Sequence, residues 1–94
     1  MALGVLTIHL AFYSCKSLKE KRRLLKSLLQ RIHKEFNVSV AEMGLQNKWT
    51  ESIISVSYIC NNRIHAQSEL NSVLTFIQNY YRNIDILENH IELI

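Results

Sequence analysis

The sequence predicts one α+β domain whose elements follow the order β-α-β-β-α-β. Four segments are predicted to be strands: 2–13, which is mostly apolar, 38–43 and 52–60, and 84–93, whose alternation is uneven. Two segments between them place apolar residues at helical spacing, one ending near Phe36 and the other near Tyr81. The chain has 94 residues, two Gly and no Pro, so it offers neither a linker nor a second core, and a single domain over residues 1–94 is expected.

The first segment, residues 2–13, predicts a strand. Its even positions share one face, expected to be the core side: Gly4, Leu6, Ile8, Leu10 and Phe12. No positive residue precedes this apolar stretch, as one would in a signal peptide, and no run is long enough to span a membrane. A buried strand is therefore the better interpretation, and we expect a cytoplasmic protein without a membrane role.

Residues 17–20 fit a capping box that begins the first helix. The Ser17 hydroxyl can accept from the amide of Glu20, and the Glu20 carboxylate can reach back to the amide of Ser17. The helix is expected to continue to about Phe36. Its expected apolar stripe consists of Leu18, Leu25, Leu29, Ile32 and Phe36, with Leu28 on the border.

The rest of the chain is predicted to form two strands, a second helix and a last strand. Residues 38–43 and 52–60 are expected to be strands joined by the polar connection 44–50. Asn61-Asn62 can cap a second helix whose stripe is Ala66, Leu70, Val73, Ile77 and Tyr81. The apolar residues of 84–93 do not all fall on one face, so the last strand is expected to contain a bulge or an irregular edge.

This order predicts a ferredoxin-like fold, with two helices on one face of a four-stranded antiparallel sheet. The other face has no helix to cover it and mixes small, hydroxyl and apolar side chains, which favours an interaction surface. We expect a homo-oligomer, most simply a dimer, to use this face. The candidate interface residues are Thr7, His9, Met43, Ile53, Ser55, Ser57 and Ile59.

Charge is unevenly distributed along the chain. Residues 1–48 carry nine Lys and Arg against three Glu, and residues 49–94 carry two Arg against five acids, which gives +6 and −3 and sums to the net +3. Eight of the basic residues lie between Lys16 and Lys34 with one acid, Glu20. Such a helix can bind a phosphate backbone or an acidic protein surface. The alternative interpretation is an ordinary solvated helix face that has no partner.

The candidate nucleic-acid or anion-binding residues follow from this basic helix and its surroundings. Four cations form one flank, the helix start adds free amides, and Trp49 could stack on a base. A simple N-cap at Ser17 and a Trp that closes the core remain alternatives. The candidates are Ser17, Lys19, Lys21, Arg22, Arg23, Lys26, Lys34, Gln46, Trp49 and Arg63.

Catalytic and metal-binding patterns are poor. The four His lack metal-ligand spacing, the carboxylates form no obvious pair, and no nucleophile turn exists. Cys15 and Cys60 do not form a CxxC pair and are interpreted as reduced thiols. We therefore expect neither an enzyme, nor a cofactor, nor a metal site.

Several segments together resemble the YlxP-like family of small uncharacterised bacterial proteins. They are 17–22, 36–42, Gln46, Trp49, Asn61 and Arg63. The sequence departs from the family at Asn47 and Asn62, where Asp is usual, so a carboxylate role there is not expected. The resemblance implies a ferredoxin-like fold, no established activity, and genes that often lie beside those of translation and ribosome-maturation factors.

The sequence thus favours a non-enzymatic cytoplasmic protein that docks on RNA or a ribosomal particle through its first helix. The alternative is a homo- or hetero-oligomeric module that uses the open sheet face. A third hypothesis is a small-molecule or anion sensor with Ser17 and Arg22 at its pocket.

Overall fold

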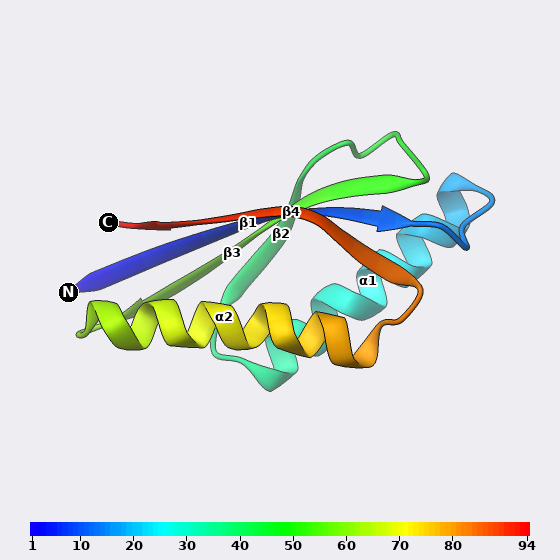
Figure 1. Cartoon of the computed structure of the whole chain (residues 1–94). Coiled ribbons are helices and arrows are strands. Elements are labelled where there is room, and N and C mark those ends of the chain that lie inside the picture. The colour runs from blue at the N-terminus through cyan, green and yellow to red at the C-terminus, as the bar shows by residue number, and fades with distance from the viewer.

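A computed structural model describes all 94 residues and confirms the predicted order and the ferredoxin-like fold (Figure 1). Both helices lie on one side of a four-stranded antiparallel sheet of order β2-β3-β1-β4. The elements are β1 Ala2–Phe12, α1 Leu18–Glu35, β2 Ser39–Gly44, β3 Glu51–Cys60, α2 Arg63–Tyr80 and β4 Ile84–Leu93.

β1 is a central strand and sets the register of the sheet. It pairs with β3 from Ala2 opposite Cys60 to Ala11 opposite Glu51, and with β4 on its other side. The expected irregularity of the last strand is confirmed, because the register shifts at Leu87, which has no partner on β1. A second shift, at Met43 in β2, was not predicted.

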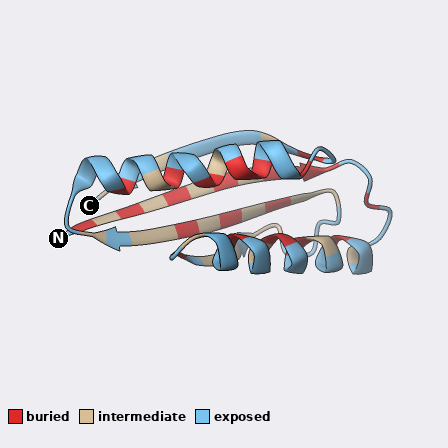
Figure 2. Ribbon diagram, turned by 90° about the horizontal axis from the view of Figure 1, so that it is seen from below, coloured by how far each residue is buried: buried red, intermediate tan, exposed pale blue.

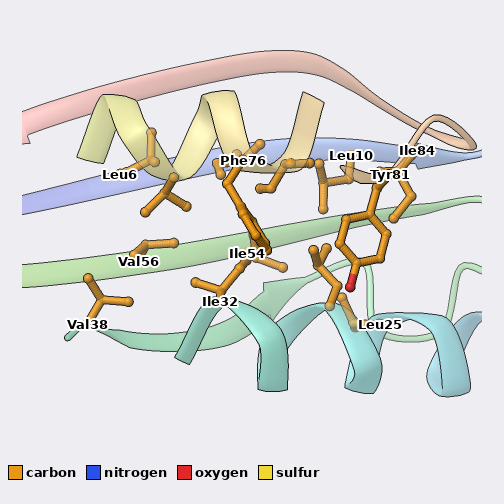
Figure 3. Packing of buried hydrophobic residues seen from close by; sticks show 14 of the residues in the cluster. Leu6, Leu10, Leu25, Ile32, Val38, Ile54, Val56, Phe76, Tyr81 and Ile84 are labelled. Atoms are coloured by element: carbon orange, nitrogen blue, oxygen red, sulfur yellow. The ribbon is translucent and has the colours of Figure 1, made fainter. Parts of the chain in front are cut away.

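The core lies between the sheet and the two helices. The even face of β1 is buried as predicted, and so is the α2 stripe of Ala66, Leu70, Val73, Ile77 and Tyr81. Figure 3 shows Phe76 and Tyr81 projecting from the α2 side toward Ile32 and Leu25 of α1. The two helices thus meet beneath the sheet over aromatic side chains.

The buried stripe of α1 differs from the prediction. It consists of Lys21, Leu25, Leu28 and Ile32; Leu28 is fully buried, whereas Leu18, Leu29 and Phe36 of the expected stripe are only half-buried. At 100° per residue the centre of the stripe is rotated by roughly 40° from the expected one. Figure 2 shows that the rest of α1 is largely exposed. Neither helix combines the length and the apolar character that crossing a membrane requires.

Both helices begin with side-chain caps. The Ser17 hydroxyl accepts from the Glu20 amide at 3.1 Å, as predicted. The second half of the expected capping box differs, since the Glu20 carboxylate accepts from the amide of Lys16 at 2.8 Å. Asn62 caps α2 by accepting from the amide of His65 at 3.0 Å.

Arg31 joins the two helices at their outer surface. Its guanidinium carbon lies 5.3 to 5.9 Å from the ring centres of Phe76, Tyr80 and Tyr81. Such cation–π contacts stabilise a packing by about 0.5–1 kcal/mol each at exposed sites. This cation of α1 is therefore used within the fold.

A close approach of β1 to α2 requires a glycine at position 4. A Cβ there would lie 2.6 Å from Cδ1 of Leu70, which is fully buried. We expect Gly4→Ala to lower the free energy of unfolding by about 1–3 kcal/mol in urea titrations, because a packed core has no room for the methyl group. In a Leu70→Val background, which lacks that Cδ1 atom, the same change should cost clearly less. If Gly4→Ala lowered the free energy of unfolding equally in both backgrounds, the contact with Cδ1 of Leu70 would not be what requires a glycine at position 4.

Candidate nucleic-acid interface

Lys21, predicted to contact an anion, lies inside the protein. Its side chain is 0% exposed, and its Nζ atom donates to the carbonyl of Leu45 at 2.7 Å and lies 2.9 Å from Oε2 of Glu42. Both partners belong to the chain, so this ammonium group cannot reach a phosphate. Its assignment to the binding surface was wrong.

The same ion pair extends into a small polar network. Oε2 of Glu42 also accepts from the hydroxyl of Ser52 at 2.6 Å, and Ser52 is fully buried. Leu45 has a φ of 59°, the only positive φ in the chain. A side chain with a Cβ disfavours that conformation, so the bond from Lys21 helps to hold the loop in place. The network thus fixes α1, β2 and β3 to one another.

This network brings the β2–β3 loop to the start of α1. Leu45 begins the loop, and Gln46 and Trp49 follow in it. Gln46 is exposed and Trp49 is 44% exposed, so the indole does not simply close the core. Figure 1 shows the loop, in green, at the same end of the molecule as the first turn of α1.

The remaining candidate cations of α1 form one exposed surface. All are solvent-exposed, and none takes part in any of the three ion pairs of the structure. We call this set the outer face of α1: Lys19, Arg22, Arg23, Lys26 and Lys34. Their contact with RNA stays a prediction, but the structure brings them together.

The start of α1 already holds its own anionic group. The Ser17 hydroxyl is engaged by the Glu20 amide, and the Glu20 carboxylate is engaged by the Lys16 amide. These groups fill the place where a small anion was expected. The structure therefore favours the simple N-cap at Ser17 over a pocket for an anion.

Arg63 lies far from the outer face of α1. It begins α2 directly beyond the Cys60 end of β3, whereas Trp49 precedes the Glu51 end of the same strand. The molecule is 42 Å long, and Figure 1 shows these ends on opposite sides. The candidates therefore do not form one cluster, because Arg63 is separated from the rest, and its contact with a ligand stays a prediction. Near Arg63 the Tyr58 hydroxyl and Nε2 of His65 are 3.0 Å apart.

The open sheet face collects the predicted interface residues as expected from strand parity. Thr7 lies opposite Ser55, and His9 lies opposite Ile53. Met43 and Ile59 are the most exposed of the set, at 62% and 63%. No helix covers this face (Figure 1), and its use by a second subunit stays a prediction.

An ion pair crosses one end of the open face. Nε2 of His9 lies 2.7 Å from Oε1 of Glu51, and Nζ of Lys48 contacts the other oxygen of the same carboxylate. The hydrogen bonds from Lys48 and then from His9 lower the pKa of Glu51. This carboxylate therefore remains ionised at neutral pH, and Lys48 is not a free cation.

The nucleophilic and metal-ligating side chains show no activated centre. Burial, followed by the charge of Glu20, raises the pKa of the Cys15 thiol. A thiol with a raised pKa is a poor nucleophile at neutral pH. No three His, Cys, Asp or Glu side chains converge in a way that could hold a metal ion.

The burial of the Lys21–Glu42 ion pair predicts that removing the ammonium group lowers stability. Lys21→Met should lower the free energy of unfolding by about 2–4 kcal/mol, because it leaves Glu42 and the Leu45 carbonyl without their donor. Urea unfolding followed by circular dichroism measures this loss. Lys26→Met, on the outer face of the same helix, is the matched control and should change stability by less than about 0.5 kcal/mol. Similar effects of the two variants would contradict the structural role of Lys21.

Comparisons with known proteins identify a family and one solved structure of similar fold. Residues 3–91 match a family described as a protein of unknown function, DUF503. The chain is 35% identical over 78 residues to "Uncharacterized protein YlxP" of Bacillus subtilis (strain 168), covering 83% of this chain and 85% of that protein. It also resembles the solved structure of "De novo designed protein Foldit4", with a TM-score of 0.54, 16% identity, and coverage of 100% and 97% of the two chains.

The likeness to the designed protein shows the fold alone, since the identity is low. The family match and the YlxP relative each span most of the chain, as the resemblance of the motifs predicted. The chain therefore belongs to the YlxP-like DUF503 family of uncharacterised proteins.

Proposed function

We propose that the protein is a non-enzymatic RNA-binding protein whose docking surface is the outer face of α1. The observation that carries the proposal is a set of exposed cations on one helix that have no acidic partner anywhere in the chain. Cations in this state keep their full charge for an external anion. The RNA can be free or part of a ribosomal particle.

The positions of these cations on the helix support a polyanionic ligand. Lys19, Arg23 and Lys26 lie roughly 130–170° from the centre of the buried stripe, so they point away from the core. Lys34 extends the surface, and the distance along the helix axis from Lys19 is about 22 Å at 1.5 Å per residue. That length accommodates several consecutive phosphates of one strand.

Like charges are repeated along this face at helical contact distance. Lys19 and Arg23 are four residues apart, and so are Arg22 and Lys26. Such pairs destabilise a helix by a few tenths of a kcal/mol each. The cost is small, but a surface needed only for solubility would avoid it by mixing in acids. A phosphate backbone offsets this repulsion when it binds.

The β2–β3 loop supplies a different kind of contact at one end of the same surface. The exposed indole of Trp49 can stack on an unpaired base, and Gln46 can form hydrogen bonds beside it. The loop is held beside α1 by the bond from Lys21 to Leu45. In the proposal the cations of α1 supply affinity, and the loop orients the ligand.

The first test is the charge on the outer face. The triple variant Lys19→Gln, Arg23→Gln, Lys26→Gln should bind labelled structured RNA more weakly and with a shallower salt dependence. Each lost phosphate contact reduces the slope of log affinity against log salt by about 0.7–0.9. Fluorescence anisotropy between 50 and 200 mM salt measures both quantities.

Two single variants, each of which removes one positive charge, provide the matched control. Arg23→Gln removes a cation from the outer face, and Arg63→Gln removes one from the far end of the molecule. The proposal requires the first to weaken RNA binding more than the second, with both variants folded by circular dichroism. Absence of RNA binding by the unaltered protein at 50 mM salt, or equal effects of the two variants, would refute it.

A dimer through the open sheet face is the second candidate function. The observation that favours it is the exposure of Met43 and Ile59 on a face that no helix covers. Ile53→Asp places a charge on this face, where Ile53 lies opposite His9. Sedimentation velocity should then show a dimer of the unaltered protein converted to a monomer, with little effect of salt. A monomer before the substitution would exclude this candidate.

A further inference from the structure

The outer edge of β4 carries backbone groups without partners. In the sheet β4 pairs with β1 alone, and beyond its end Leu3 and Ile94 exchange both backbone hydrogen bonds, at 3.3 and 2.7 Å. In an antiparallel ladder such pairs alternate with residues whose N–H and C=O groups point the other way. Counting back from Ile94, the residues that direct these groups outward are Leu93, Ile91 and Asn89.

This edge lacks most of the features by which proteins block strand addition. Edges are usually protected by Lys or Pro, by short strands or by bulges. β4 is ten residues long and contains no Pro, Lys or Arg. Its bulge lies at Leu87, and the register runs without interruption from Glu88 to Leu93. The opposite edge, β2, has six residues and a bulge at Met43.

The carboxylates of β4 give this edge an acidic charge, with His90 between Glu88 and Glu92 on the same face. Asp85, Glu88 and Glu92 lie on β4, and none of them takes part in an ion pair. Glu88 lies opposite His9 and Glu92 opposite Val5, so both carboxylates belong to the open face of the sheet. Two copies of this edge would bring acids toward acids, whereas a basic strand would be attracted.

We propose that the outer edge of β4 binds an extended, Lys- or Arg-rich segment of a partner protein as a fifth strand of the sheet. The main chain of that segment would bond to the outward groups of Asn89, Ile91 and Leu93. Its basic side chains on the open face would lie beside Glu88 and Glu92. Strand addition takes its affinity from main-chain hydrogen bonds and its specificity from alternate side chains. The surface is separate from the outer face of α1, so this inference does not depend on RNA binding.

The test uses a labelled ten-residue peptide of alternating Lys and Thr. Asn89→Pro removes one outward amide and leaves the bonds to β1 in place, as edge strands tolerate. Asn89→Ala keeps the amide and is the matched control. We expect Asn89→Pro to weaken peptide binding by about tenfold or more, a loss that corresponds to one or two hydrogen bonds. Asn89→Ala should bind within about twofold of the unaltered protein.

Two further experiments test the proposal if Asn89→Pro does not fold. A peptide methylated on every backbone nitrogen keeps its charge but cannot pair with a strand, and it should fail to bind. The double variant Glu88→Gln, Glu92→Gln should weaken binding of the unmodified peptide and reduce its salt dependence.

Three results would overturn the proposal. The first is no binding of the unmodified peptide at 50 mM salt. The second is equal binding of the methylated peptide, which would mean attraction by charge alone. The third is a dimer of the unaltered protein that Asn89→Pro converts to a monomer, which would assign the edge to a second copy of this chain. Loss of RNA binding in the α1 variants with peptide binding intact would leave this proposal standing, so the two proposals fail separately.

Discussion

The bond from Lys21 to Glu42 and Leu45 is the constraint on which the arrangement of the molecule depends. Hydrophobic burial holds the helices against the sheet, but it has no direction and would tolerate small rotations of α1. An ammonium group that is completely buried tolerates none, because it must keep both of its oxygen partners. Buried ion pairs are weak contributors to net stability and better suited to selecting one arrangement. Here the selected arrangement includes the rotation of α1 and the path of the β2–β3 loop.

The outer surface of α1 follows from that rotation. With Lys21 among the inward residues, the buried stripe is centred between Lys21 and Ile32, and the opposite side of the helix carries Lys19, Arg23 and Lys26. Had the stripe been centred on Leu18 and Leu29, the same cations would lie on a flank, beside the core and partly screened by it. Because Lys21 faces the core, the orientation of the helix places the other cations on the solvent side. It also places the loop with Trp49 at the end of the surface they form.

The sequence was sufficient for the features that depend on neighbouring residues. Strand alternation placed Leu6 and Ile8 in the core, and the caps at Ser17 and Asn62 began the helices where predicted. Lys21 could not be found in this way, since its partners Glu42 and Leu45 lie 21 and 24 residues away and a Lys on an amphipathic helix is normally solvated.

The candidate site was predictable only in part for a similar reason. The clustering of cations along one helix is a local property, and it was correct. The distance between Arg63 and the other candidates depends on strand direction, which places the two ends of β3 at opposite ends of the molecule. The open edge of β4 also required the sheet order, because alternation identifies a strand but does not say which of its two sides has a neighbour.

The sheet order also separates the two charged surfaces. α1 packs beside β2, at one edge of the sheet, and the acidic residues of β4 lie at the other. Three strand spacings put these edges about 14 Å apart. The Debye length at physiological ionic strength is about 8 Å, so charges exposed to solvent at that separation are largely screened from one another. An anion bound at α1 therefore neither strengthens nor weakens the attraction of a basic segment to β4 to any large extent. If both proposals hold, one molecule binds both ligands at once, and the sheet between the two surfaces fixes their relative orientation.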